Sequence, residues 1–127
     1  MELAKAAGAK RALPLAVSIA AHSTLMNSIQ SKWDAAVDAV TMRDASAPIF
    51  GNVAARALTS ADDLRADIRA QMQSRVRWTE SVQGMIRSGI RHFVEVGSGS
   101  VLGGLVKRID GSVTSQALGN PSDFGAL

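Results

Sequence analysis

The sequence contains no cysteine among its 127 residues, and this absence removes several kinds of chemistry at once. Disulfide bonds, thiolate nucleophiles and cysteine metal sites are excluded for these residues. Tyrosine is also absent, and only 4% of the residues are aromatic. A hydrophobic core must therefore be built mainly from Ala, Val, Leu, Ile and Met.

Long apolar runs are missing as well. No run reaches the roughly 18 residues that a membrane-spanning helix requires. The first eight residues, Met1 to Gly8, lack the apolar centre of a signal peptide. We therefore expect a cytoplasmic protein that does not contact membranes.

The net charge of +3 invites a nucleic-acid reading, but the distribution of charge argues against it. Basic residues alternate with acidic ones, as in the segment 62–69. This pattern favours a solvated helix face over a stripe that follows phosphates. We expect no nucleic-acid partner.

The apolar pattern predicts strands that alternate with helices, and hence an α/β layered domain. Helices are predicted over residues 2–7, 23–40, 61–72, 79–88 and 101–109, with Ser23, Ser60 and Gly89 as caps. Strands are predicted over Arg11–Val17, Ile49–Val53, Ile90–Val96 and Val113–Leu118. The tail from Gly119 is expected to fray.

The chain has two histidines, too few for a metal cluster in a sequence without cysteine. His22 follows an apolar stretch and is flanked by small residues, which suits a general base at the end of a strand. A structural alternative is that His22 caps a helix or lies in an exposed loop. His92 opens a predicted strand, where we expect it to pair along a sheet edge.

A general base needs a nucleophile, yet the sequence holds no Gly-x-Ser-x-Gly elbow. A second reading comes from the glycine-rich turn Gly97–Gly103, which follows a strand and opens a helix. Such a turn can bind a nucleotide or S-adenosylmethionine at the helix N-terminus. The simpler interpretation is a tight turn whose glycines serve the backbone alone.

Several short patterns occur in an order that resembles the C-terminal part of malonyl-CoA:acyl carrier protein transacylases, which are related to the acyltransferase domains of polyketide synthases. The resemblance covers about Leu3 to Pro121. The markers are Ala9-Lys-Arg11, Pro14-Leu-x-Val-Ser18, His22-Ser-x-Leu-Met26, Pro48-Ile-x-x-Asn52-Val53, Gln71, Val76-Arg-Trp78, Ser81-Val82, Met85-Ile86, Phe93-Val-Glu-Val-Gly97-x-Gly99-x-Val-Leu and Lys107-Arg-Ile109.

This resemblance implies the C-terminal part of an α/β-hydrolase-like acyltransferase domain. Residues 1–17 would end a small ferredoxin-like subdomain, residues 18–118 would belong to the large subdomain, and residues 119–127 would form a tail. The nucleophilic serine, the arginine that pairs with malonyl and the oxyanion donors would lie in a missing N-terminal half. We therefore expect a fragment that is inactive alone and associates with that half or with itself.

The resemblance also assigns the site. His22 matches the catalytic base, and the main-chain carbonyl of Gln71 would orient its ring. Asn52 would support the substrate region, and Ala21 stands where the family often carries Phe or Ser, which puts strict malonyl selectivity in doubt. Ser98 replaces a usual proline. The substrates implied are malonyl-CoA and acyl carrier protein, with no metal or redox cofactor.

Overall fold

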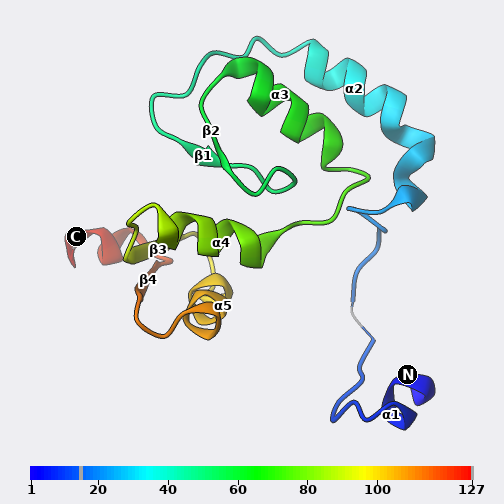
Figure 1. Cartoon of the computed structure of the whole chain (residues 1–127), viewed down its shortest axis with the longest axis vertical. Helices are drawn as coiled ribbons and strands as arrows, with labels where there is room; N and C mark the ends of the chain where they lie inside the picture. The colour runs from blue at the N-terminus through cyan, green and yellow to red at the C-terminus, as the bar shows by residue number, and fades with distance from the viewer. Residues whose placement is uncertain (15, 127) are drawn as a thin grey trace.

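The computed structural model describes residues 1–14 and 16–126 and shows a mixed α/β chain (Figure 1). The helices are α1 (Glu2–Ala6), α2 (Gln30–Asp38), α3 (Ala61–Ala70), α4 (Trp78–Arg87) and α5 (Val101–Ile109), with 3-10 helices η1 (Thr24–Ile29) and η2 (Pro121–Ala126). The strands are β1 (Ile49–Phe50), β2 (Ala57–Leu58), β3 (His92–Val96) and β4 (Thr114–Leu118).

One half of the fold consists of α2, α3 and the antiparallel hairpin β1–β2 (Figure 1). Polar bonds join the two helices. Arg65 on α3 donates to the carbonyl oxygens of Val37 and Val40, where α2 ends, and Arg69 pairs with Asp38. Because the carbonyls at a helix C-terminus lack intrahelical partners, Arg65 acts as a cap for α2.

The other half places α5 against the parallel pair β3–β4, with α4 packed on α5. Its core is Val82, Val106 and Val113, which are 0%, 2% and 4% exposed. Half-buried apolar side chains surround this cluster, namely Trp78, Ile86, Phe93 and Ile109. The core is thus aliphatic at its centre, as the scarcity of aromatics predicts.

Two predicted caps are confirmed. The Ser60 side chain accepts a hydrogen bond from the Asp63 amide at the start of α3. Gly89 has a φ of 97° after α4, and the amides of Gly89 and Ile90 donate to the carbonyls of Ile86 and Met85. These paired bonds form a Schellman motif, which glycine favours because it adopts positive φ without strain.

Other predictions need correction. Among the described residues of the predicted strand Arg11–Val17 no strand forms; Leu15 lies outside the described residues. Those residues have no neighbouring strand to bond with, and Pro14 has no amide to donate. The predicted strand Ile49–Val53 ends at Phe50, because Gly51 bonds to Arg56 and turns the chain.

The predicted cap at Ser23 is wrong, and the tail from Gly119 contains a 3-10 helix. The hydroxyl of Ser23 donates to the Ala20 carbonyl instead of accepting from a helix amide. The chain after it begins as a 3-10 helix and becomes α-helical only at Gln30. In the tail, the Asp123 carboxylate accepts from the amides of Gly119 and Asn120 and holds the turn that precedes η2.

The described residues contain no helix long and apolar enough to cross a membrane. Within the same residues, no three His, Cys, Asp or Glu side chains gather into a group that could hold a metal ion.

We expect Val82→Ala to lower the free energy of unfolding by about 2 kcal/mol, because it empties space at the centre of the core. Val101→Ala is the matched control, since Val101 is 70% exposed and its truncation should change the unfolding free energy by less than about 0.5 kcal/mol. Urea unfolding followed by circular dichroism measures both. Equal losses in the two variants would show that the core is placed wrongly.

Candidate functional site

The His22 side chain reaches across the fold to the end of α3. Its Nδ1 lies 2.8 Å from the carbonyl oxygen of Gln71. The His22 backbone has a φ of 64°, a left-handed conformation that is uncommon for a residue with a side chain. Such strain persists only where surrounding contacts impose it, and it gathers at functional sites.

This contact determines which ring nitrogen carries the proton. A carbonyl oxygen can only accept, so Nδ1 of His22 must be the donor. In the neutral ring, Nε2 is then unprotonated and free to accept a proton. Since His22 is exposed, that nitrogen is open to a reacting group.

The C-terminal carbonyls of α3 and its cap are satisfied by three side chains from the segment 22–33. Trp33 donates through Nε1 to Ile68 at 2.9 Å, and Gln30 donates through Nε2 to Arg69 at 3.0 Å. His22 completes the series at Gln71. The C-terminal end of α3 thus faces the imidazole.

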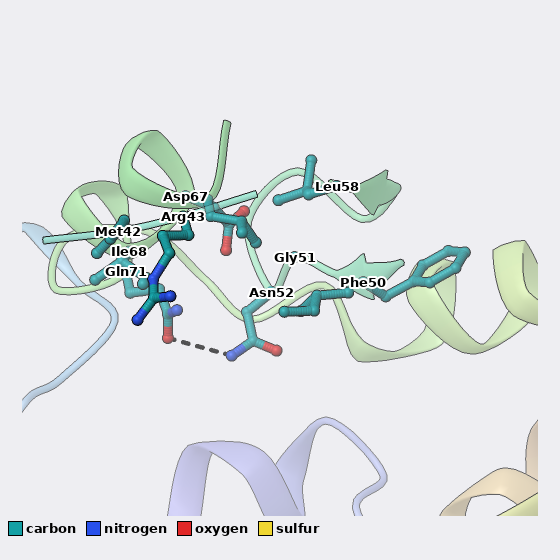
Figure 2. A pocket seen from close by; sticks show the side chains of 11 residues that line it. Met42, Arg43, Phe50, Gly51, Asn52, Leu58, Asp67, Ile68 and Gln71 are labelled. Carbon is teal, nitrogen blue, oxygen red and sulfur yellow. Dashed lines mark hydrogen bonds between the residues drawn. The ribbon is translucent and has the colours of Figure 1, made fainter. Parts of the chain in front are cut away.

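Asn52 and Gln71 are joined by their side chains. Asn52 donates through Nδ2 to Oε1 of Gln71 at 3.2 Å, the dashed line in Figure 2. The Asn52 carbonyl accepts from the Arg77 amide at 2.8 Å. Two predicted site residues, His22 and Asn52, are therefore both bonded to the third, Gln71.

The turn that carries Asn52 rests on a buried carboxylate. Asp67 is 7% exposed, and its Oδ1 accepts from the amides of Val53 and Ala54 at 3.1 and 2.7 Å. Gly51 lies so close that an added Cβ would be 2.5 Å from the same oxygen. The expectation that residues 62–69 form a solvated face is wrong for Asp67, which points inward because the turn supplies its bonds.

A largely apolar cavity of about 420 Å³ lies beside this network (Figure 2). Its lining includes four residues with polar side chains, Arg43, Asn52, Asp67 and Gln71. His22 and Ala21 lie outside the set of described residues that line it. Ala21, which precedes His22 in the chain, is half-buried.

Charged groups near the turn are paired. Arg77 contacts the carbonyls of Val53 and Ala54 and bonds to Glu80. A hydrogen bond from the Glu80 backbone amide lowers the pKa of the Glu80 carboxyl below its usual value. A hydrogen bond from the Arg77 side chain lowers it further. A hydrogen bond from Arg56 likewise lowers the pKa of Asp63.

The glycine-rich turn Gly97–Gly103 already uses one of its backbone amides in a hydrogen bond within the chain. The Gly103 amide in the first turn of α5 donates to Oε2 of Glu95 at 2.9 Å, so a carboxylate of the chain holds a donor that a phosphate would need. Gly97 and Gly99 have φ of 131° and 106°. These facts favour the structural interpretation of the turn over a nucleotide site.

His92 behaves as predicted for a sheet residue. It pairs with Thr114 in the β3–β4 register, and its Nδ1 lies 2.7 Å from the Thr114 hydroxyl.

Sequence reasoning did not identify Asp67, Gln30 or Trp33. Asp67 and Gln71 are four residues apart, which places them on one face of a helix. That spacing is a signal, but a carboxylate among alternating charges looks the same whether exposed or buried. Gln30 and Trp33 contact α3 across more than thirty positions of sequence, and no local pattern encodes such pairing.

Comparison with known proteins agrees with the resemblance. No protein-family model matches the chain. The chain is 41% identical to the malonyl CoA-acyl carrier protein transacylase of Escherichia coli K12 over 122 residues. The matched region covers 96% of this chain and 40% of that enzyme. The Bacillus subtilis enzyme is 40% identical over 120 residues, or 94% of this chain and 38% of that enzyme.

Solved structures give the same result. A malonyl-transacylase in complex with a type II PKS acyl-carrier protein matches with a TM-score of 0.92 and 34% identity, over 98% of this chain and 40% of that chain. The malonyl-CoA:ACP transacylase of Synechocystis matches with a TM-score of 0.89 and 33% identity, over 94% and 41%. The chain thus spans about 40% of the length of its relatives.

We expect Gly51→Ala to destabilise the fold by about 1–3 kcal/mol, because its Cβ would collide with the Asp67 carboxylate. Gly104→Ala is the control, since nothing lies within 4 Å of a Cβ there and alanine should stabilise α5 by about 0.5–1 kcal/mol. Thermal unfolding of both variants measures the difference. A Gly51→Ala protein as stable as the parent would mean that the carboxylate does not sit against this turn.

Proposed function

We propose that this chain, a homologue of malonyl CoA-acyl carrier protein transacylases over about 40% of their length, supplies the general base for malonyl transfer from coenzyme A to acyl carrier protein. The observation that carries the proposal is the bond between His22 Nδ1 and the Gln71 carbonyl. It selects the tautomer whose Nε2 can accept a proton.

The reaction would proceed in two half-steps. In the first, a serine hydroxyl gives its proton to His22 Nε2, and its oxygen attacks the malonyl thioester carbonyl. The carbon–sulfur bond breaks, and the coenzyme A thiolate leaves with the proton from the imidazolium. In the second, the phosphopantetheine thiol of acyl carrier protein gives its proton to Nε2, its sulfur attacks the serine ester, and the serine oxygen takes the proton back.

The nucleophile is outside these 127 residues in this proposal. No Gly-x-Ser-x-Gly pattern occurs in the sequence, so His22 has no elbow serine of its own to activate. The arginine for the malonyl carboxylate and the oxyanion donors are assigned to the same unseen residues. The chain by itself is therefore proposed to be inactive, and to act with the half that carries the serine.

We also propose finer assignments, which the homology supports without testing them residue by residue. We place residues 1–17 at the end of a ferredoxin-like subdomain, residues 18–118 in an α/β-hydrolase-like subdomain, and residues 119–127 in a tail. Asn52 is assigned to support of the site, in line with its bond to Gln71. Ala21 leaves more room beside the proposed base than Phe or Ser would. We propose the cytoplasm as the location.

The simplest test uses the chain alone. We expect no mass change when the purified chain is incubated with malonyl-CoA and analysed by intact mass spectrometry, because it lacks the elbow serine. A stable adduct one malonyl group heavier than the chain would contradict the claim that the nucleophile lies elsewhere.

A chimera tests the base itself. The aligned segment of the Escherichia coli enzyme, 40% of its length, is replaced by this chain, and malonyl transfer to acyl carrier protein is measured. We expect His22→Ala to lower the rate of transfer by about 10²–10⁴-fold, the usual contribution of a positioned general base.

His92→Ala in the same chimera is the matched control, since His92 lies on β3 and bonds to Thr114. Its rate should stay near that of the unsubstituted chimera. A His22→Ala chimera that transfers malonyl at the unsubstituted rate would refute the proposed role.

A further inference from the structure

We infer that Asp67 is a positioning residue, which fixes the His22 imidazole through the turn 51–55, Asn52 and Gln71. The inference rests on the proposed role of His22 as the base. It adds a buried carboxylate that touches neither His22 nor a reacting group.

The burial of Asp67 gives it this capacity. The residue is 7% exposed, and one oxygen accepts two backbone hydrogen bonds from successive residues, Val53 and Ala54. Bonds to an ionised acceptor are stronger than neutral ones, and more so where water is excluded. Asp67 therefore fixes the backbone of the turn against α3.

Gly51 makes this approach possible. The glycine has no Cβ, and an added one would lie 2.5 Å from Oδ1 and 2.7 Å from Cγ of Asp67. The carboxylate thus occupies the space that any larger residue would fill.

The turn is attached to α3 at a second point. Asn52 donates to the side chain of Gln71, which lies one helical turn beyond Asp67 on the same face. Because Asp67 fixes the turn, Asn52 stays in position to donate its hydrogen bond to Gln71. Helix ends fray when their last residues lack such contacts, and Gln71 is the C-cap of α3.

The chain of contacts ends at the proton on His22. The exposed ring can carry its neutral-state proton on either nitrogen, and the Gln71 carbonyl favours Nδ1. If Gln71 moves, this preference weakens. The effect of Asp67 is therefore visible as a change in the tautomer of His22, which differs from a loss of stability.

The test measures both histidine tautomers by long-range ¹H–¹⁵N NMR on the 127-residue chain, about two pH units above the usual imidazole pKa of about 6.5. Asp67→Asn keeps the size of the side chain but removes the charge. We expect the ratio of Nε2–H to Nδ1–H forms of His22 to rise about fivefold, as for the loss of one net hydrogen bond. His92 should not change and serves as the internal reference.

Asp62→Asn is the matched control, because Asp62 lies exposed in the first turn of the same helix. Asn52→Ala is the second variant, and it keeps the buried carboxylate and its two donors. Asn52→Ala should change the His22 tautomer ratio in the same direction, and the His92 signals verify that it is folded. This variant keeps the inference testable if Asp67→Asn does not fold.

An unchanged His22 ratio in folded Asp67→Asn, or in Asn52→Ala, overturns the inference, and so does an equal change in Asp62→Asn. The result is separable from the proposed function, because the tautomer is measured without substrate. A tautomer shift together with an inactive chimera would retain the positioning role and refute the acyl-transfer role alone.

Discussion

The site depends on one constraint, which is that the carbonyl groups at the end of α3 must find donors outside their own helix. Three side chains from a distant segment meet this need: Trp33, Gln30 and His22. The first two join α2 to α3, and the third places an imidazole at the negative end of the helix. The bond that would orient a catalytic ring is thus part of an ordinary solution to helix termination.

This arrangement shows how a histidine ring is oriented without a carboxylate partner. In a Ser-His-Asp triad, an acidic side chain holds the ring and stabilises its charge. Here a backbone carbonyl accepts a hydrogen bond from the ring and so can do the first task. The Gln71 carbonyl is fixed by the end of a folded helix. The contacts that hold Gln71 in place therefore correspond to the contacts that hold the aspartate in a triad.

The sequence predicts those parts of the fold that local chemistry determines. The alternation of strands and helices, the Ser60 cap and the Gly89 turn were all predictable, because each depends on residues within a few positions. The predicted strand Arg11–Val17 was not observed in the described residues, since an apolar run forms a strand only beside a partner. His22 was a candidate from its position after an apolar stretch, and Gln71 and Asn52 were added by family resemblance. The burial of Asp67 depends on a turn that only the fold brings to it.

The contact between His22 and Gln71 joins residues 49 positions apart, and His22 itself is exposed. The aliphatic core around Val82 lies in the other half of the fold and makes no use of it. Local opening can therefore release the imidazole at a lower free-energy cost than global unfolding. The orientation of the His22 ring is therefore bounded by a local equilibrium, while α4, α5 and the parallel strands can remain folded.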